Sequence, residues 1–185
     1  KTAMGLRDWR PEGCVGQYRL PGCSVDLGLP DMSFREAVAA GANSVVIGVA
    51  PSGGALKVEW VSALAEAIRS GLSLVSGLHR KLSEESELVK AAAASGQQLI
   101  DIRVPPASIS IATGRRRSGK RLLMVGTDCC VGKKYSALSL HKALKERGIA
   151  ATFRATGQTG ILIAGRGIPM DAVVSDFLSG AAEML

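Results

Sequence analysis

Residues 126–133 are the part of this sequence whose residue types and spacing most clearly favour chemistry with phosphates. They read Gly-Thr-Asp-Cys-Cys-Val-Gly-Lys and follow a short apolar stretch. Glycines at both ends permit the backbone turn that lets several N–H groups converge on one anion. A helix that begins near Lys133 adds its own N–H groups and the positive end of its dipole. The pattern predicts a phosphate-binding strand–loop–helix.

This loop differs from a regular P-loop, G-x-x-x-x-G-K-[ST], at two points. Five residues rather than four separate Gly126 from Gly132, and Lys134 stands where a hydroxyl would bind Mg²⁺. An ATPase or kinase needs that hydroxyl to hold Mg²⁺ against the β and γ phosphates. We therefore expect the loop to hold a diphosphate without hydrolysing it. The residues expected to contact this cofactor are Gly126, Thr127, Cys129, Cys130, Val131, Gly132, Lys133 and Lys134.

Coenzyme A carries a diphosphate and a 3′-phosphate, and a basic cluster precedes the loop. Residues 1–108 contain 11 Lys/Arg and 11 Asp/Glu, whereas residues 109–185 contain 12 and 5, so the second half is expected to meet an anion. Nucleic acid is not expected, because the cluster lacks interleaved aromatic residues and a recognition motif. The candidate partners for the 3′-phosphate are Arg115, Arg116, Arg117 and Lys120.

A second polar loop covers residues 154–160 and follows a predicted strand. Ligands collect at the carboxyl ends of the strands in an open parallel sheet, so the two loops should lie side by side. Arg154 is a candidate partner for a substrate carboxylate, although an ordinary polar loop would have the same composition. The candidate hydrogen-bond donors to the substrate are Thr156, Gln158 and Thr159.

Few residues could act as a general base in this sequence. His79 follows a predicted strand, but a structural histidine explains it as well. Asp128 lies inside the phosphate loop and could act as the base or orient a turn. No metal site is expected, because Cys14 and Cys23 have no CxxC partner and no nearby histidine.

The elements that must position these residues alternate regularly between residues 33 and 104. Ser33 and Glu36 form a capping box before a helix over 34–40. An apolar stripe predicts a helix over 58–69, and Ser83 is expected to cap a third helix that ends at Gly96. Apolar, β-branched runs predict strands over 44–49, 72–75 and 99–104. The first thirty residues, rich in glycine, proline and charge, are expected to form an ordered loop that could line a site.

The second half continues with a predicted strand over 121–125, a helix over 133–147 and a strand over 149–153. Residues 171–184 have helical character. We predict an α/β fold with a parallel-sheet domain over 1–108 and a second α/β domain over 109–185. No apolar run approaches 18 residues, so no transmembrane helix is expected. Four cysteines without a disulfide pattern indicate reduced thiols in the cytoplasm.

Four segments of the chain, in order, are similar to the D-glutamate (D-amino-acid) N-acetyltransferase family, long described only as a domain of unknown function. They begin with Arg10-Pro11-Glu12 and Cys14-Val15-Gly16-Gln17, and continue with Ser76-Gly77-Leu78-His79 and the loop from Val125 to Lys133. The most specific is Arg154-Ala155-Thr156-Gly157-Gln158-Thr159-Gly160-Ile161-Leu162-Ile163-Ala164-Gly165-Arg166-Gly167.

This resemblance implies a Rossmann-like N-terminal domain and a P-loop-like C-terminal domain, of which this chain would contain only the start. It also implies transfer of an acetyl group from acetyl-CoA to the amine of D-glutamate or a related D-amino acid. Such a two-domain enzyme is expected to form a homo-oligomer. Cys130 and Lys134 differ from the residues expected at their positions, which are Ser and Met.

Two other functions agree with the same residues. The loop is also similar to that of dethiobiotin synthetase, which would make the protein an ATP-binding ligase or kinase, and Lys134 is the argument against it. The protein could instead bind a nucleotide without catalysis, although no GxGxxG follows a visible strand. Within the transferase hypothesis, Cys129 or Cys130 could form an acyl-enzyme, or could simply be small residues in a tight loop.

Overall fold

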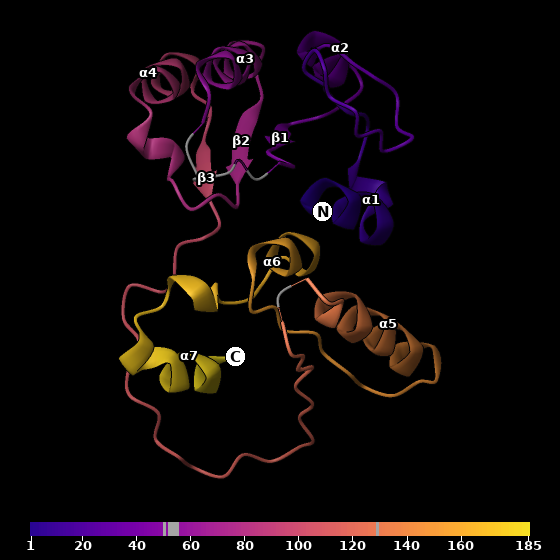
Figure 1. The fold of residues 1–185 in the computed structure, drawn as a ribbon, viewed down its shortest axis with the longest axis vertical. Coiled ribbons are helices and arrows are strands. Elements are labelled where there is room, and N and C mark those ends of the chain that lie inside the picture. The colour runs from indigo at the N-terminus through magenta and orange to yellow at the C-terminus, as the bar shows by residue number, and fades with distance from the viewer. Residues whose placement is uncertain (50, 52–55, 129) are drawn as a thin grey trace. The chain divides into compact units, whose positions relative to one another are not determined.

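A computed structural model describes residues 1–49, 51, 56–128 and 130–185 of the chain. It consists of two units, Lys1–Val104 and Pro105–Leu185. Figure 1 shows the sheet in the first unit and the helices α5, α6 and α7 in the second. No helix among the described residues is long and apolar enough to cross a bilayer.

The first unit is built on a three-stranded parallel sheet. Its strands are β1 (Ser44–Val46), β2 (Ser73–Ser76) and β3 (Leu99–Asp101), and they pair in the order β1-β2-β3. The predicted parallel sheet is confirmed, but β1 and β3 end earlier than the runs 44–49 and 99–104. The carboxyl end of β3 is fixed by Asp101, whose carboxylate accepts the N–H of Leu82 at 3.0 Å.

Helices α3 (Val58–Arg69) and α4 (Ser86–Ser95) join these strands and lie side by side (Figure 1). Small buried residues let them approach closely, and the large residues beneath them are fully buried. Removing such a leucine typically costs about 2–5 kcal/mol, so this cluster stabilises the unit. Its core includes Ala65, Ile68, Leu72, Leu74, Leu82, Leu88 and Ala92.

Local sequence signals determine most helix ends here. The capping box of Ser33 and Glu36 is confirmed at the start of α2 (Phe34–Ala39). Gly96 ends α4 in the left-handed conformation, at a φ of 67°. The expected cap at Ser83 is wrong. Ser83 lies in a separate 3₁₀ turn, Leu82–Glu84, because Leu82 is buried and held by Asp101, and α4 begins only at Ser86.

The N-terminal segment contains more regular structure than the expected loop. Residues Thr2–Trp9 form α1, and Pro11–Gly13 form a 3₁₀ turn. A Cβ atom on Gly48 would lie 2.5 Å from Cβ of Ala3, so α1 packs directly against the chain that follows β1. This tertiary contact stabilises α1, a helix that was hard to predict because its sequence contains charged residues and a glycine.

The second unit contains helices without a paired sheet among its described residues. They are α5 (Lys133–Glu146), α6 (Gln158–Ala164) and α7 (Leu178–Met184). The predicted helix 133–147 is confirmed to within one residue. The helical prediction over 171–184 is correct only for α7, because Met170–Ala172 and Ser175–Phe177 form 3₁₀ turns.

The strands predicted over 121–125 and 149–153 are not formed in the described chain. Leu122, Leu123 and Val125 are 71, 74 and 79% exposed, and Ile149 is 50% exposed. A strand requires hydrogen bonds to a neighbouring strand, and the described residues supply none here. Among the described residues of this unit, strand-like pairing is limited to a single parallel bridge between Ala155 and Gly167.

Candidate functional site

The loop before α5 has a backbone conformation that few residues can adopt. Gly132, the residue before the helix, has a φ of 106°, and Cys130 has a φ of 62°. Cys130 is the only residue other than glycine with a positive φ among the described residues. Such a left-handed residue next to a helix start turns backbone N–H groups toward one side of the loop. The strand predicted before this loop is absent, but the helix after it is present.

Lys133 crosses the loop. Its Nζ donates a hydrogen bond to the carbonyl oxygen of Asp128. A Cβ atom on Gly126 would lie 2.8 Å from Cγ2 of Val131 and 3.2 Å from Cγ of Lys133. The absence of a side chain at Gly126 therefore makes room for the lysine, whose ammonium is held over the backbone of the loop as a point charge.

The first turn of α5 continues the site. No side chain caps the helix, and its first residues are basic. Nζ of Lys134 lies 4.8 Å from the ring centre of Tyr135, a cation–π contact. His141 lies two turns further along, where its Nε2 is 3.2 Å from the carbonyl oxygen of Ala151. That contact gives His141 a structural role in holding the chain after α5.

Not every predicted cofactor residue can be placed. Thr127, Asp128 and Val131 are exposed in the loop, and Cys130 is also exposed. Cys129 lies outside the described residues. No group of three or more His, Cys, Asp or Glu side chains in the described chain could hold a metal.

The second polar segment is partly helical. Gln158 and Thr159 form the first turn of α6 rather than a loop, and Thr159 is buried. The carbonyl oxygen of Thr156 accepts the N–H of Met170 at 3.1 Å. Arg154 is exposed and has no hydrogen bond or ion pair with any described residue. Of the four residues proposed to bind the substrate, Arg154 therefore has a charged group that is available to a ligand.

The two candidate bases belong to different units. His79 is exposed in the bend after β2, and Asp128 is exposed in the loop before α5. The basic segment before the loop is anchored within its own unit. Glu183 of α7 accepts hydrogen bonds from N and Oγ1 of Thr113, both 2.7 Å long, and Arg117 lies 3.6 Å from it. Arg117 therefore already has an acidic partner.

A polar network lies in the N-terminal segment that the sequence suggested could line a site, although none of the residues of the network was singled out. Gln17 is 9% exposed, and its Nε2 donates to Oδ1 of Asp26 at 2.8 Å and to the carbonyl oxygen of Leu29 at 2.9 Å. Its Oε1 accepts the N–H of Leu27 at 2.9 Å. One buried amide thereby fixes a loop that has little regular structure.

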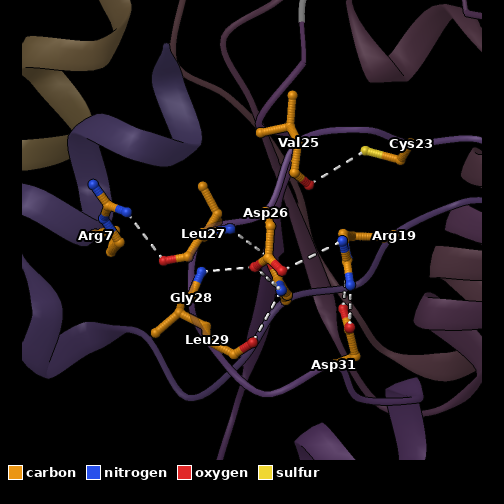
Figure 2. A network of polar contacts seen from close by, with 10 residues as sticks. Arg7, Arg19, Cys23, Val25, Asp26, Leu27, Gly28, Leu29 and Asp31 are labelled. Carbon is orange, nitrogen blue, oxygen red and sulfur yellow. Dashed lines mark hydrogen bonds and ion pairs between the residues drawn. The ribbon is translucent and has the colours of Figure 1, made fainter.

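Arg19 lies between two carboxylates in the same network (Figure 2). Its Nε and Nη2 donate to the two oxygens of Asp31, and its Nη1 lies 3.6 Å from Oδ2 of Asp26. The hydrogen bonds from Arg19 lower the pKa of Asp31, and Asp31 in turn raises the pKa of Arg19. In the sequence, this network could have been found only from the spacing of Arg19, Asp26 and Asp31 around proline-containing turns.

Both halves of the chain match models of a known protein family. Residues 18–105 match the N-terminal, Rossmann-like domain of DUF1611, a family of unknown function. Residues 110–185 match its C-terminal P-loop domain. The chain belongs to the DUF1611 family. These matches confirm the predicted α/β fold class, with a Rossmann-like part followed by a P-loop part.

Curated relatives of this DUF1611 protein are enzymes by name. The chain is 53% identical over 185 residues to a D-glutamate N-acetyltransferase from Tritonibacter scottomollicae. It is 50% identical over 185 residues to a D-glutamate N-acetyltransferase from a Pseudoalteromonas species. Both alignments cover the whole chain but only 56% of the relative. The resemblance inferred from the sequence motifs is confirmed.

A solved structure supports the same assignment. The crystal structure of a DUF1611 family protein from Anabaena variabilis is similar to this chain, with a TM-score of 0.74 and 39% sequence identity. The similarity covers 84% of this chain and 46% of the other. The fold described above is therefore similar to that of part of a DUF1611 family protein.

Proposed function

We propose that this chain belongs to an enzyme that transfers an acetyl group from acetyl-CoA to the amine of D-glutamate or a related D-amino acid. The observation that carries the proposal is the identity of 53 and 50%, over the whole chain, to two relatives named D-glutamate N-acetyltransferase. Because the chain spans about 56% of their length, the activity of the whole protein stays a proposal.

Two features of the loop before α5 support its proposed role in holding the diphosphate of coenzyme A. Gly126 leaves room for the side chain of Lys133, and the ammonium of Lys133 places a positive charge on the loop. The N-terminus of α5 adds the positive end of its dipole, which favours an anion. Bound acetyl-CoA would supply an activated thioester carbonyl to the reaction. The residues proposed to hold it are those of the loop from Gly126 to Lys133, with Lys134 beside them.

The other residues proposed for the reaction act on the amino acid. The exposed Arg154 would pair with a carboxylate of the acceptor, and a base would remove a proton from its ammonium. Asp128 and His79 are the two candidates for that base. The base works only when it is deprotonated, so turnover falls at low pH as the base takes up a proton. Replacing the true base should remove that acid limb of the pH profile, so the profiles of Asp128→Asn and His79→Gln decide between them.

ATP is the alternative ligand, and one contact argues against its use as a substrate. Residue 134 is a lysine, so position 134 has no hydroxyl that could bind Mg²⁺. The Nζ of Lys134 lies over the ring of Tyr135 instead. A loop of this kind would hold a diphosphate rather than promote attack on a γ phosphate.

Calorimetric titration with acetyl-CoA and with ATP tests the proposal. We expect acetyl-CoA to bind, and Lys133→Ala to weaken that binding by about tenfold or more, because a charge-assisted contact to phosphate is lost. Lys142→Ala is the matched control, since Lys142 lies on the same helix and pairs only loosely with Glu146, at 4.0 Å. Its affinity should stay within about twofold of the parent.

A coupled assay of thiol release then measures transfer to D-glutamate. ATP binding without acetyl-CoA binding, or Mg²⁺-dependent phosphate release from ATP, would reject the transferase proposal in favour of a ligase or kinase. Binding of either nucleotide without turnover would favour a regulator.

We also propose that the protein is a cytoplasmic homo-oligomer that acts on a small molecule, not on nucleic acid or a membrane. Cys14, Cys23 and Cys130 are free thiols, which supports a reducing compartment. Light scattering of the purified protein measures the oligomeric state, and a monomer at all concentrations would contradict that part of the proposal.

A further inference from the structure

A groove in the first unit has no role in the function proposed above. It has a volume of about 460 Å³ and is lined by residues 17–20, Cys23 and residues 31–33. That volume lies within the range of about 300–1,000 Å³ that is usual for small-molecule sites. Its charged lining residues are Arg19 and Asp31, one of each sign.

The Arg19 guanidinium still has donors to offer. Nε and Nη2 both donate to Asp31, but Nη1 makes no hydrogen bond with any described residue and lies 3.6 Å from Asp26. A guanidinium has five N–H groups, so those on Nη1 can meet a carboxylate. Figure 2 shows Arg19 held between Asp26 and Asp31, which keeps its plane fixed.

Asp31 offers the opposite charge at the same place. Its side chain is 53% exposed, and its pKa is lowered by the hydrogen bonds from Arg19, so it stays a carboxylate at neutral pH. A carboxylate has more acceptor sites than the two hydrogen bonds from Arg19 use. An ammonium group can therefore bind Asp31 while Arg19 remains in place.

The walls of the groove are held before any ligand arrives. The side chain of Gln17 holds residues 26–29 in place through its three hydrogen bonds. A Cβ atom on Gly16 would lie 2.7 Å from Sδ of Met32, so the two chain segments that line the groove are in close contact. The ring of Tyr18 stacks on the buried ring of Phe34, with centroids 4.1 Å apart. Such preorganisation lowers the entropic cost of binding.

We propose that this groove binds a free α-amino acid as its zwitterion. The carboxylate of the ligand meets Nη1 of Arg19, and its ammonium meets Asp31. The inference goes beyond the proposed function, because it requires neither the acetyl donor nor any residue of the second unit.

Amide NMR titration of the full chain with three small probes tests this site. Glycine carries both charges, N-acetylglycine lacks the ammonium, and glycinamide lacks the carboxylate. Glycine should shift the amides of Tyr18, Arg19 and Met32 in a saturable way. The other two probes should bind these residues about tenfold more weakly, because each of them lacks one of the two charge-assisted contacts that glycine makes.

Variants then separate the two charges. Arg19→Lys should weaken the binding of glycine by about tenfold, because the lysine ammonium cannot reproduce the planar arrangement of donors in the guanidinium. Asp31→Asn should remove the preference for glycine over N-acetylglycine. Arg69→Lys is the matched control, since Arg69 lies outside the groove and is 3.8 Å from Glu87. It should leave all three affinities unchanged.

Equal binding of the three probes, or shifts confined to the second unit, would overturn the proposal. These titrations on the parent chain decide the matter even if a variant does not fold. Loss of acetyl transfer in the enzyme assay has no bearing on this result, so a failure of the proposed function is distinguished from a failure of this site.

Discussion

Gln17 is the residue on which the N-terminal loop depends most. Its side-chain amide makes three hydrogen bonds to Asp26, Leu27 and Leu29, and its own backbone bonds to Pro30 and Met32. The amide is nearly buried, so water cannot replace a partner that is lost. Hydrogen bonds from Gln17 and from the N–H of Gly28 lower the pKa of Asp26.

Replacing Gln17 with leucine should destabilise the first unit. The N–H of Leu27 and the carbonyl of Leu29 would lose their partners, and each such buried loss costs about 1–3 kcal/mol. Urea unfolding measures the difference. Gln98→Leu is the control, because Gln98 is exposed, and its effect should stay within about 0.5 kcal/mol. Equal stability of Gln17→Leu and the parent would contradict this role.

At the level of elements, α7 organises a segment that precedes the loop before α5. Gly180 is buried in α7, and a Cβ atom there would overlap the carbonyl oxygen of Ser110. One turn later, Glu183 binds Thr113 and Arg117. A short helix thereby holds residues 110–117 at two points, and most of this attachment involves backbone atoms.

Gly180→Ala should reverse the usual sign of a glycine-to-alanine change in a helix. Alanine normally stabilises a helix by about 1 kcal/mol relative to glycine. Here the added methyl group must push the backbone of Ser110 away, so we expect a lower melting temperature. Ser179→Ala on the exposed side of α7 is the control and should change the melting temperature little. A stabilising Gly180→Ala would show that α7 does not pack on this segment.

The anchor at Glu183 should weaken in acid. The hydrogen bond from the N–H of Thr113 lowers the pKa of Glu183 from its ordinary value of 4.5. A carboxyl whose pKa is lower in the folded state stabilises at pH above its unfolded value, and that contribution disappears as the pH falls through the folded value. The protection factor of the Thr113 amide against hydrogen exchange should therefore fall below pH 4.5.

Glu183→Gln should lose that pH dependence and show weaker protection at neutral pH. Glu146→Gln is a suitable control, because Glu146 makes only a 4.0 Å contact with Lys142. If the protection of Thr113 were the same in Glu183→Gln and the parent at every pH, the anchor would have no energetic role.

For the described chain as a whole, the exposed apolar segment before the loop that precedes α5 is open to contact with another chain. Leu122, Leu123 and Val125 are all more than 70% exposed and lie in a segment without helix or strand. Unpaired apolar strands are templates for pairing with another chain. Leu123→Lys should therefore reduce the mass of the protein in light scattering after gel filtration.

The control for this change is Val58→Lys, since Val58 is 80% exposed but begins a helix instead of an extended run. It should leave the mass unchanged. The same mass for Leu123→Lys and the parent would exclude this segment as a contact between copies.

Local patterns were enough to predict the first unit, apart from α1. The stripe of α3, the capping box at Ser33 and the stop at Gly96 are all encoded within a few residues. Element lengths and α1 depended on distant contacts, such as that of Asp101 with Leu82 and that of Ala3 beside Gly48. The missing strands of the second unit have the same explanation, because apolar character predicts a strand but cannot supply its neighbour.

The candidate site divides in the same way. The loop before α5 could be predicted from glycines and a lysine at fixed spacing, because its conformation is determined within eight residues. The network of Gln17 joins residues up to twelve positions apart through side chains, and no short pattern describes it. The roles of Asp128, His79 and Arg154 stay predictions.

The bridge between Ala155 and Gly167 has a consequence for engineering. The N–H of Ile168 donates to the carbonyl of Ala155 at 3.0 Å, and Gly167 passes so close to Ala155 that no Cβ would fit. The segment 156–166, with α6 inside it, therefore leaves and returns to the domain at one point, while Thr159, Gly160 and Ile163 of α6 are buried. Its exchange between family members therefore requires that Ala155 and Gly167 be kept as fixed joints and that the buried side of α6 be matched.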